Sequence, residues 1–285
     1  MTSFVDYAEI CPARKDVSLR DYTTLRVGGN AKWFFEPHKP EQLAELLSKL
    51  EFNREPFRLL GGGANSLPSD EGFDGAVIHT GQMRRIFRDG SGLRIWAGAT
   101  LPAAIRAAAE LELSGFEDLI GVPGHIGGAL AMNAGSASWG IWDIVENVTL
   151  WVPGIVESLN IEEKTPSMIQ PRYRNGNLRG AIVLEALFKL EPSSAFVIKK
   201  KQEELLRKKN STQPVTIPSA GCAFVNPPGD SAGRLLEQCG MKGVKEGDAE
   251  VSEKHANYII NRGQASSKDV RTLIKRMHQA VKENF

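Results

Sequence analysis

The sequence predicts an α+β fold, and three observations support this prediction. A strand–helix–strand pattern over residues 31–60 runs directly into three successive glycines. A second glycine-rich segment follows at residues 121–135, and short strand patterns separated by Gly, Asp and Ser lie between the two segments. This arrangement is unlike a doubly wound nucleotide-binding fold. The chain has 285 residues, more than one average domain, so we expect two or three closely packed units.

The first half of the chain provides the elements of this fold in order. Residues 1–20 have no regular pattern and are expected to form an irregular leader. Leucines recur at three- and four-residue spacing over residues 40–50, which predicts a helix. The segment 121–133 holds four glycines and one proline, too many for a regular element. The other predicted elements are strands at 31–35, 57–60, 75–79 and 93–97 and an alanine-rich helix at 103–113.

The second half alternates strands and helices and ends on an amphipathic helix, which is predicted over residues 267–284. Ser266 or Ser267 is a suitable N-cap, because a serine hydroxyl can accept a hydrogen bond from the first helical turn. The other predicted elements are strands at 148–152, 181–190 and 258–261, a short strand after Pro214, and helices at 195–209 and 231–239.

Composition and charge exclude several classes of function. The net charge of +1 provides no broad field for nucleic acid or a membrane surface. No stretch approaches the roughly 20 apolar residues that span a bilayer, and the N-terminus lacks the basic region of a signal peptide. Cys11, Cys222 and Cys239 form neither a CxxC pair nor a metal-ligand spacing. We therefore expect a cytoplasmic protein with reduced thiols and no metal.

The first glycine-rich segment is Leu60-Gly61-Gly62-Gly63-Ala64-Asn65-Ser66, directly after a predicted strand. Glycines let the backbone curl around an anion and point N–H groups at it, and Asn65 tolerates a left-handed backbone. One interpretation is a cradle for a pyrophosphate, and the other is a plain turn. The segment lacks the GxGxxG spacing and the GK[ST] ending of the common phosphate-binding motifs, so alone it favours the turn.

The second segment runs from Gly121 to Gly135. Its glycines allow close backbone approach to a flat or phosphorylated ligand, and the alternative is a tight packing corner between two sheets. His125 in this segment is a candidate polar contact, although a lone histidine is more often structural. The two segments together suggest a cofactor cradle.

Five motifs in chain order resemble those of the UDP-N-acetylenolpyruvoylglucosamine reductase (MurB) family, from about residue 18 to the C-terminus. The resemblance implies an FAD-binding domain of the vanillyl-alcohol-oxidase (PCMH) type at residues 21–192, with lobes at about 21–72 and 73–192, and a C-terminal α/β substrate-binding domain at 193–285. The motifs are Tyr22 to Gly29, Leu60 to Asn65 with Ser69 to Phe73, Gly121 to Gly135, Pro218 to Pro227, and Ala232 to Leu236 with Val251 to Asn257.

The resemblance also implies a reaction. In this family NADPH reduces FAD, and the flavin reduces UDP-N-acetylglucosamine enolpyruvate to UDP-N-acetylmuramate, a step of peptidoglycan precursor synthesis that serves cell-wall biogenesis, cell shape and cell division. We expect a monomer with these two small molecules as partners. The implied FAD-binding residues are Gly61, Gly62, Gly63, Ala64, Asn65, Ser66, Gly121, Pro123, Gly124, Gly127, Gly128, Asn133, Ala134 and Gly135.

Two catalytic residues follow from the resemblance. Hydride addition to an enol ether bearing a carboxylate needs a cation to hold the developing charge and an acid to protonate carbon. Arg174 occupies the family's Tyr-Arg position, and a guanidinium can grip a carboxylate through two hydrogen bonds. Cys222 occupies the position of the proton donor, which is a serine or cysteine, and a free thiol is mostly protonated at neutral pH. The alternatives are a surface arginine and a small buried cysteine.

Three substrate contacts complete the predicted site. Asn226 lies four residues after Cys222, and on an extended strand this spacing returns to the same face. Cys222 and Asn226 are therefore expected to face one pocket. Tyr173 and His255 are further candidates for substrate contact.

The family usually continues past its final helix with a segment that carries a catalytic glutamate, whereas this chain ends at Phe285. A catalytically impaired FAD-binding protein of the same family is therefore the alternative hypothesis. A flavin oxidase of the same broad fold is a third hypothesis, and the motifs around Cys222 and His255 argue against it.

Overall fold

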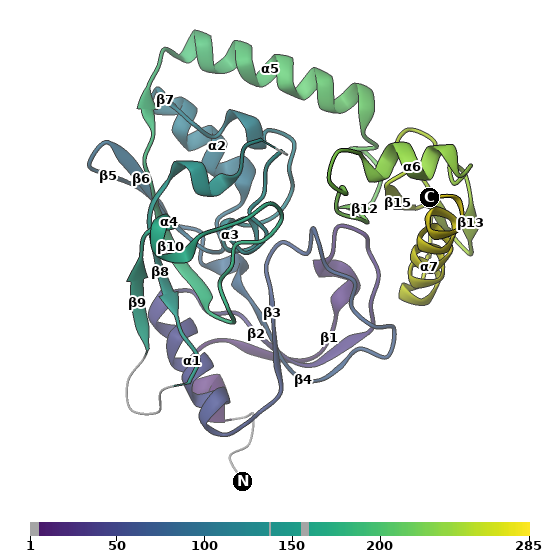
Figure 1. The fold of residues 1–285 in the computed structure, drawn as a ribbon. Coiled ribbons are helices and arrows are strands. Elements are labelled where there is room, and N and C mark those ends of the chain that lie inside the picture. Colours follow the sequence, from purple (N-terminus) through teal and green to yellow (C-terminus); the bar gives the residue numbers. More distant parts are fainter. Residues whose placement is uncertain (1–5, 137, 155–159) are drawn as a thin grey trace. The chain divides into compact units, whose positions relative to one another are not determined.

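The computed structural model describes residues 6–136, 138–154 and 160–285 (Figure 1). Residues 1–5 of the predicted leader lie outside the described residues. The chain divides into two compact units, and each of them is assembled from three stretches. Unit 1 comprises Met1–Lys15, Trp33–Gly62 and Gly75–Leu206, and unit 2 comprises Asp16–Lys32, Gly63–Asp74 and Arg207–Phe285.

The strands of the described residues form four sheets, and the predicted α+β class is confirmed by the mixture of these sheets with separate helices. One sheet has the order β1-β2-β4-β3, and its strands β3 and β4 pair in parallel with Leu60 opposite His79. A five-stranded sheet has the order β5-β6-β10-β8-β9 and is antiparallel throughout. Strands β7 and β11 pair alone, and unit 2 holds the sheet β12-β15-β14-β13. The strands are β1 Ala13–Ser18, β2 Asn30–Phe35, β3 Phe57–Leu60, β4 Phe73–His79, β5 Ile86–Asp89, β6 Gly92–Trp96, β7 Leu113–Ser114, β8 Val145–Trp151, β9 Ile161–Lys164, β10 Ile182–Phe188, β11 Glu191–Pro192, β12 Ser219–Cys222, β13 Lys245–Glu246, β14 Ala249–Val251 and β15 Tyr258–Asn261.

The helices of unit 1 cover its five-stranded sheet with apolar side chains. In α1, Leu43, Leu46, Leu47 and Leu50 are fully buried, as their helical spacing predicts. Helices α1 and α3 pack against β10, which supplies the buried Phe188. The α-helices are α1 Pro40–Phe52, α2 Leu101–Glu110, α3 Ile126–Ala131, α4 Pro166–Ile169, α5 Ala195–Thr212, α6 Ala232–Gln238 and α7 Ser267–Asn284, and the short 3-10 helices are η1 Asp6–Glu9, η2 Leu19–Tyr22, η3 Thr80–Gln82, η4 Glu117–Leu119 and η5 Ile141–Ile144.

Unit 2 has its own core, in which α7 packs against β13, β14 and α6. Leu273 and Met277 of α7 are fully buried there, and Leu25 and Val27 from the first stretch of the unit join the same cluster. The early residues 16–32 therefore belong to the core that the C-terminal helix closes.

Two groups of side chains cap α7. Ser266 is the N-cap, as predicted, and forms a capping box in which its hydroxyl accepts from the Asp269 N–H at 3.0 Å. Asp70 accepts the next two free N–H groups, from Ser267 at 2.7 Å and from Lys268 at 2.9 Å. The first turn of α7 is thus held by a carboxylate that lies far away in the sequence.

Two expectations about the first half of the chain are wrong. The leader is not irregular throughout, because residues 13–18 form β1. This strand is at the edge of its sheet and none of its residues is buried, so its charged sequence shows no apolar alternation. The segment 121–133 contains a regular element after all, the short helix α3, in which Ile126 and Leu130 are fully buried. Burial of these two side chains outweighs the low helix propensity of the glycines.

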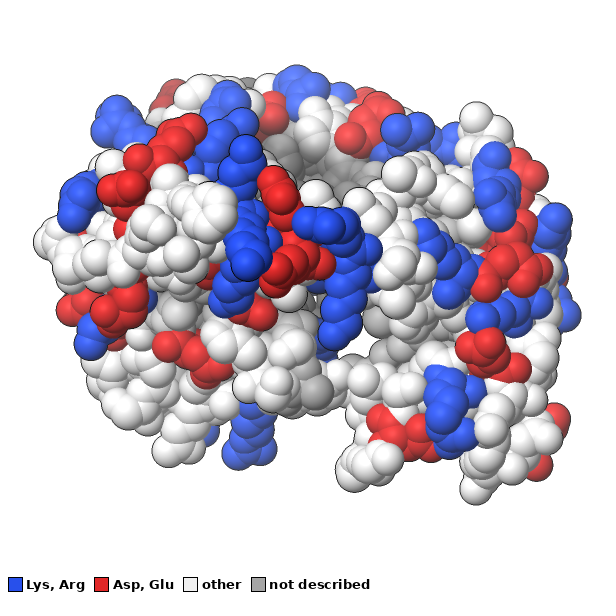
Figure 2. All heavy atoms as spheres, turned by 90° about the horizontal axis from the view of Figure 1, so that it is seen from above, with Lys and Arg blue, Asp and Glu red and all other residues white. Residues whose placement is uncertain are grey.

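Surface charge is mixed. Lys and Arg side chains alternate with Asp and Glu side chains over the face shown in Figure 2, in keeping with the net charge of +1. Within the described ranges, no helix is both long and apolar enough to span a bilayer.

The cap on α7 provides a test of unit 2. Asp70→Ala leaves two N–H groups without their acceptor, so we expect the free energy of unfolding to fall by about 1–2 kcal/mol, measured by urea denaturation. Asp74→Ala is the matched control, because Asp74 is 85% exposed in its ion pair with Lys32 and exposed pairs contribute about 0–1 kcal/mol. Equal losses in the two variants would contradict the capping role.

Candidate functional site

The two glycine-rich segments meet in unit 1. A Cβ atom on Gly62 would lie 2.8 Å from Cα of Gly124 and 3.1 Å from Cδ2 of His125. The backbone of Gly124 is itself fixed, since its carbonyl accepts from the Leu101 N–H at 2.9 Å. Gly62 is therefore required by a close approach between two segments of backbone.

The continuation of the first segment belongs to unit 2. Gly63 has a φ of +61°, and a Cβ there would lie 2.0 Å from the carbonyl oxygen of Tyr22. The Thr24 N–H donates to the Gly63 carbonyl at 3.2 Å, and the Thr24 hydroxyl donates to the Ser219 carbonyl on β12 at 2.7 Å. Thr24 thus joins the glycine segment to the strand that carries Cys222. Of the remaining predicted residues, Ala64 and Ser66 are half-buried and Asn65 is exposed.

The second segment is partly open and partly packed. A Cβ on Gly128 would meet nothing within 4 Å, whereas one on Gly127 would lie 3.0 Å from Cβ of Ala97. Gly121 and Pro123 are exposed, the Ala134 N–H donates to Ala129 at 2.8 Å, and Gly135 pairs with Gly140. The exposed glycines leave bare backbone on the surface of this segment.

Asn133 connects this segment to the loop that carries Tyr173 and Arg174. Its amide Nδ2 donates to the Arg172 carbonyl at 3.0 Å. The Gly176 N–H donates to the Ala131 carbonyl at 2.9 Å, and a Cβ on Gly176 would lie 2.1 Å from the Leu130 carbonyl oxygen. Asn133 was predicted to bind the cofactor, and the structure shows that its side chain holds this loop.

The loop is strained. Four of its non-glycine residues have a positive φ between +51° and +56°: Gln170, Arg174, Asn177 and Arg179. Such conformations cost about 1–3 kcal/mol each and persist where the surroundings impose them. Here the Arg172 and Asn175 backbones exchange two hydrogen bonds, of 2.7 and 3.0 Å, across the turn. The guanidinium carbon of Arg174 lies 5.3 Å from the centre of the Tyr173 ring, so the two predicted side chains contact each other.

Cys222 in unit 2 is exposed and lies at the end of β12. It lies opposite Tyr258 on β15, after an irregularity in the ladder at which Gly221 has a φ of +79°. The ring of Tyr258 contacts that of His255 edge to face, with centroids 5.0 Å apart. The structure therefore brings the predicted residues Cys222 and His255 together through Tyr258.

Asn257 fixes the segment that follows Cys222. This fully buried amide accepts from the Phe224 N–H at 2.9 Å and donates to the Phe224 carbonyl at 2.8 Å. Its own N–H donates to Nδ1 of His255 at 3.2 Å. Burial lowers the pKa of His255, so the imidazole is neutral at neutral pH and presents an N–H at Nε2.

The geometric argument for Asn226 is wrong. Strand β12 ends at Cys222, so a spacing of four residues does not return to one strand face. The side-chain oxygen of Asn226 instead accepts from the Ala232 N–H at 3.1 Å, at the start of α6. A Cβ on Gly233 in this first turn would lie 2.8 Å from Cε1 of His255. Asn226 therefore reaches the neighbourhood of His255 through α6.

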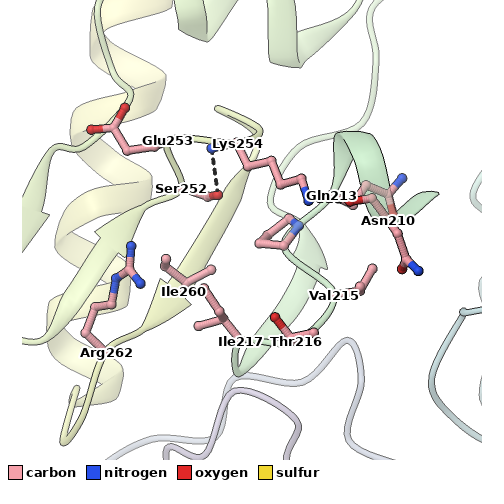
Figure 3. Close-up of a pocket in the computed structure, with 11 residues that line it drawn as sticks. Asn210, Gln213, Val215, Thr216, Ile217, Ser252, Glu253, Lys254, Ile260 and Arg262 are labelled. Carbon is pink, nitrogen blue, oxygen red and sulfur yellow. Dashed lines mark hydrogen bonds between the residues drawn. The ribbon is translucent and has the colours of Figure 1, made fainter. Parts of the chain in front are cut away.

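A hollow of about 470 Å³ also lies in unit 2 (Figure 3). It is bordered by Asn210, residues 213–217 and 252–254, Ile260 and Arg262, and none of the predicted substrate residues lines it. Its cations are engaged within the protein: the Lys254 amine donates to the Asn210 carbonyl, and Arg262 pairs with Glu250 at 2.8 Å. We assign no ligand to it.

Sequence reasoning named His125 as a candidate polar contact but favoured a structural role, and it missed two residues near the predicted ones, His79 and Asn257. Nothing in the sequence marked His79, whose ring centre lies 5.9 Å from that of His125. Asn257 stood within a recognised motif, but its hydrogen bonds depend on the fold.

Comparison with known proteins gives consistent matches. The family model of the UDP-N-acetylenolpyruvoylglucosamine reductase C-terminal domain matches residues 213–285, and that of an FAD binding domain matches residues 31–154. UDP-N-acetylenolpyruvoylglucosamine reductase 2 of Symbiobacterium thermophilum is 39% identical over 95% of this chain and 88% of that protein. The reductase of Desulforamulus reducens is 38% identical over 94% of this chain and 88% of its own length.

Solved structures show the same likeness. The crystal structure of UDP-N-acetylenolpyruvylglucosamine reductase (MurB) from Thermus caldophilus is similar with a TM-score of 0.81 and 37% identity, over 94% of this chain and 95% of that chain. Cholesterol oxidase from B. sterolicum is similar with a TM-score of 0.51 over 65% of this chain and 38% of that chain, and at 14% identity this shows the fold alone.

The contact between the glycine segments can be tested by a matched pair of substitutions. Gly62→Ala introduces a methyl group 2.8 Å from Gly124, so we expect it to lower the free energy of unfolding by about 1–3 kcal/mol. Gly128→Ala adds a methyl group in open space on α3 and should leave stability unchanged or raise it by up to about 1 kcal/mol. Urea denaturation measures both, and two variants of equal stability would refute the close approach.

Proposed function

Because the chain belongs to the UDP-N-acetylenolpyruvoylglucosamine reductase (MurB) family, we propose that it reduces UDP-N-acetylglucosamine enolpyruvate to UDP-N-acetylmuramate, with FAD as cofactor and NADPH as hydride donor. The observation that carries the proposal is the position of Cys222, an exposed thiol beside Tyr258 within the matched C-terminal domain. The reaction belongs to peptidoglycan precursor synthesis, and we place it in the cytoplasm and in a monomer.

The predicted two-part FAD-binding fold is confirmed by the match of residues 31–154 and by the likeness to the Thermus caldophilus structure, and FAD is the cofactor. We propose that the FAD-binding domain comprises residues 21–192 and that the substrate-binding domain comprises residues 193–285. The glycine segments fit such a ligand, because Gly128 opens on free space and because Gly121 and Pro123 leave exposed backbone beside it in the sequence. We propose that the backbones of residues 61–66, 121–128 and 133–135 hold the FAD.

When bound, the flavin would supply the hydride, and the side chains of the protein would bind the substrate and donate the proton. Arg174 would hold the substrate carboxylate, on which negative charge develops as hydride is added. The strained loop supports this role, since its backbone bonds and the Tyr173 ring orient the guanidinium before a ligand binds. Tyr173 would line the same subsite.

Cys222 would give its Sγ proton to the carbon next to the carboxylate. The thiol is exposed at a strand end, and the segment after it is fixed by the two hydrogen bonds of Asn257. A fixed donor reaches its proton acceptor without reorganisation. His255 would donate from Nε2 to a substrate oxygen, and Asn226 would contact the nucleotide-sugar from the start of α6.

An anaerobic experiment tests the activity itself. The FAD-loaded protein is reduced with NADPH, UDP-N-acetylglucosamine enolpyruvate is added, and flavin absorbance is followed. We expect rapid reoxidation with formation of UDP-N-acetylmuramate. A flavin that binds but stays reduced would contradict the proposal and favour an FAD-binding protein without turnover.

Loss of the thiol should separate the two half-reactions. Cys222→Ala removes the proton donor, so we expect unchanged reduction by NADPH and reoxidation by substrate slowed by about 10²–10⁴-fold. Cys222→Ser keeps a donor and should retain part of the rate. Cys239→Ala is the control, because the Cys239 thiol donates to the Ala280 carbonyl on α7 and has no role in the proposed reaction. Equal slowing of both half-reactions would argue against Cys222 as the donor.

Loss of the guanidinium should weaken the use of the substrate carboxylate. For Arg174→Ala we expect kcat/KM to fall by about 10- to 100-fold, since hydrogen bonds to charged groups contribute about 1.5–3 kcal/mol. Arg174→Lys keeps the charge without the fork and should recover only part. Arg172→Ala is the control, because the hydrogen bonds of Arg172 in this loop use its backbone and remain in the variant. Unchanged kinetics in Arg174→Ala would refute the assignment.

A further inference from the structure

A line of four titratable side chains runs through unit 1 to the glycine segments. It begins at Arg14 on β1, whose guanidinium pairs with the carboxylate of Glu36 at 2.9 Å. The other oxygen of Glu36 lies 3.6 Å from Nδ1 of His79, at the end of β4. The His79 ring stacks on Phe34 with centroids 5.5 Å apart, and its centre lies 5.9 Å from that of His125. None of these residues has a role in the proposed reaction.

The line ends against the first glycine segment. The His125 ring spans two of its residues, since a Cβ on Gly61 would lie 3.9 Å from Nδ1 and a Cβ on Gly62 would lie 3.1 Å from Cδ2. His125 also follows Gly124 directly and thus belongs to the second segment. Among the described residues it is therefore an imidazole that borders both segments.

His125 is incompletely satisfied in this state. Its Nδ1 atom is buried and has no hydrogen-bond partner within the described part of the chain, which is unfavourable for a buried polar group. Burial, together with the neighbouring His79, lowers the pKa of His125 to about 4. Burial likewise lowers the pKa of His79, against the opposing effect of Glu36. Both imidazoles are thus neutral at neutral pH, close to a place where an anion is proposed to bind.

The surrounding charges favour one proton on this histidine pair (His79 and His125). The charged groups that face His79 are Glu36 beside β2, which attracts a proton, and Arg14 on β1, which opposes it and is itself paired with Glu36. The titratable group that faces His125 is His79. Two positive charges at this separation repel each other, so the pair accepts one proton more readily than two.

We propose that the histidine pair is part of the cofactor site and takes up one proton from solvent when the pyrophosphate of FAD binds at the glycine segments. The inference rests on the proposed function, which places FAD there. The pyrophosphate carries two negative charges, and an anion near an imidazole favours its charged form. Uptake of the proton supplies a positive charge where the glycine segments themselves have none.

The coupling has a definite sign. The pKa of His125 is about 4 before binding and rises on binding. The added affinity for FAD is therefore absent at a pH above the pKa that His125 has in the FAD-bound protein. It grows as the pH falls through that pKa and is complete at about pH 4. In the window between the two values the Kd for FAD should tighten by up to about tenfold per pH unit of acidification.

Titration calorimetry of FAD into the FAD-free protein tests this directly. At about pH 6, above the pKa of His125 in the FAD-free protein, the heat is measured in two buffers of different ionisation enthalpy, which gives the number of protons taken up per FAD. We expect up to one proton in the wild type. His125→Gln keeps a hydrogen-bonding side chain of similar reach but cannot titrate, so it should still bind FAD and take up no proton.

Two controls keep the outcomes distinct. His278→Gln changes an exposed histidine on α7 and should leave proton uptake as in the wild type. His79→Gln removes the neighbour that lowers the pKa of His125, so it should retain the proton uptake or extend it to higher pH. FAD binding by the wild type without proton uptake, or with uptake unaltered in His125→Gln, would overturn the inference alone. A wild type that binds no FAD at any pH would overturn the proposed function and the inference with it.

Discussion

The approach of Gly62 to Gly124 is the contact on which the arrangement of unit 1 depends. A Cβ atom on Gly62 would lie 2.8 Å from Cα of Gly124, so a residue with a side chain does not fit at this position. Strand β3 can therefore end directly against the turn before α3, and β4, paired with β3, brings His79 beside His125. The same turn leads through α3 to Asn133 and from there to the strained loop of Arg174. One missing side chain thus permits a continuous series of contacts from the first glycine segment to the residue proposed to hold the substrate carboxylate.

Elements with a strong local pattern were predictable from the sequence. The amphipathic helix α7 and strand β15 have the predicted bounds, because helical spacing, a capping serine and β-branched residues act within a few positions. Strand β1 was missed because an edge strand with exposed side chains needs no apolar alternation. Helix α3 was missed because its stability comes from burial of Ile126 and Leu130 and not from propensity. In each case tertiary packing decided what the local sequence left open.

The site shows a similar division. Motifs indicated which segments matter, and the glycines at 62 and 63 are where close approach requires them. They did not indicate how the polar side chains are used. Asn133 holds the loop of Arg174, and Asn226 accepts from the start of α6, so both amides act within the protein before any ligand is considered. Asn257 and the histidine pair carry contacts that depend on residues distant in the sequence. Hydrogen-bond partners of this kind follow from the fold, and no spacing rule along one strand could identify them.

Because unit 2 is assembled from three stretches that include the C-terminus, it can complete its core only after unit 1 during synthesis. Unit 1 contains no residue after Leu206. All the residues of its core have therefore been synthesised before residues 207–285 emerge from a ribosome. Leu25 and Val27 are among the first residues made, yet their core partners Leu273 and Met277 are among the last. These two apolar side chains must wait for the end of translation to be covered. A piece of the chain that starts at Arg207 would also lack them together with Asp70, so the C-terminal domain is not an independent folding module that can be cut out or exchanged alone.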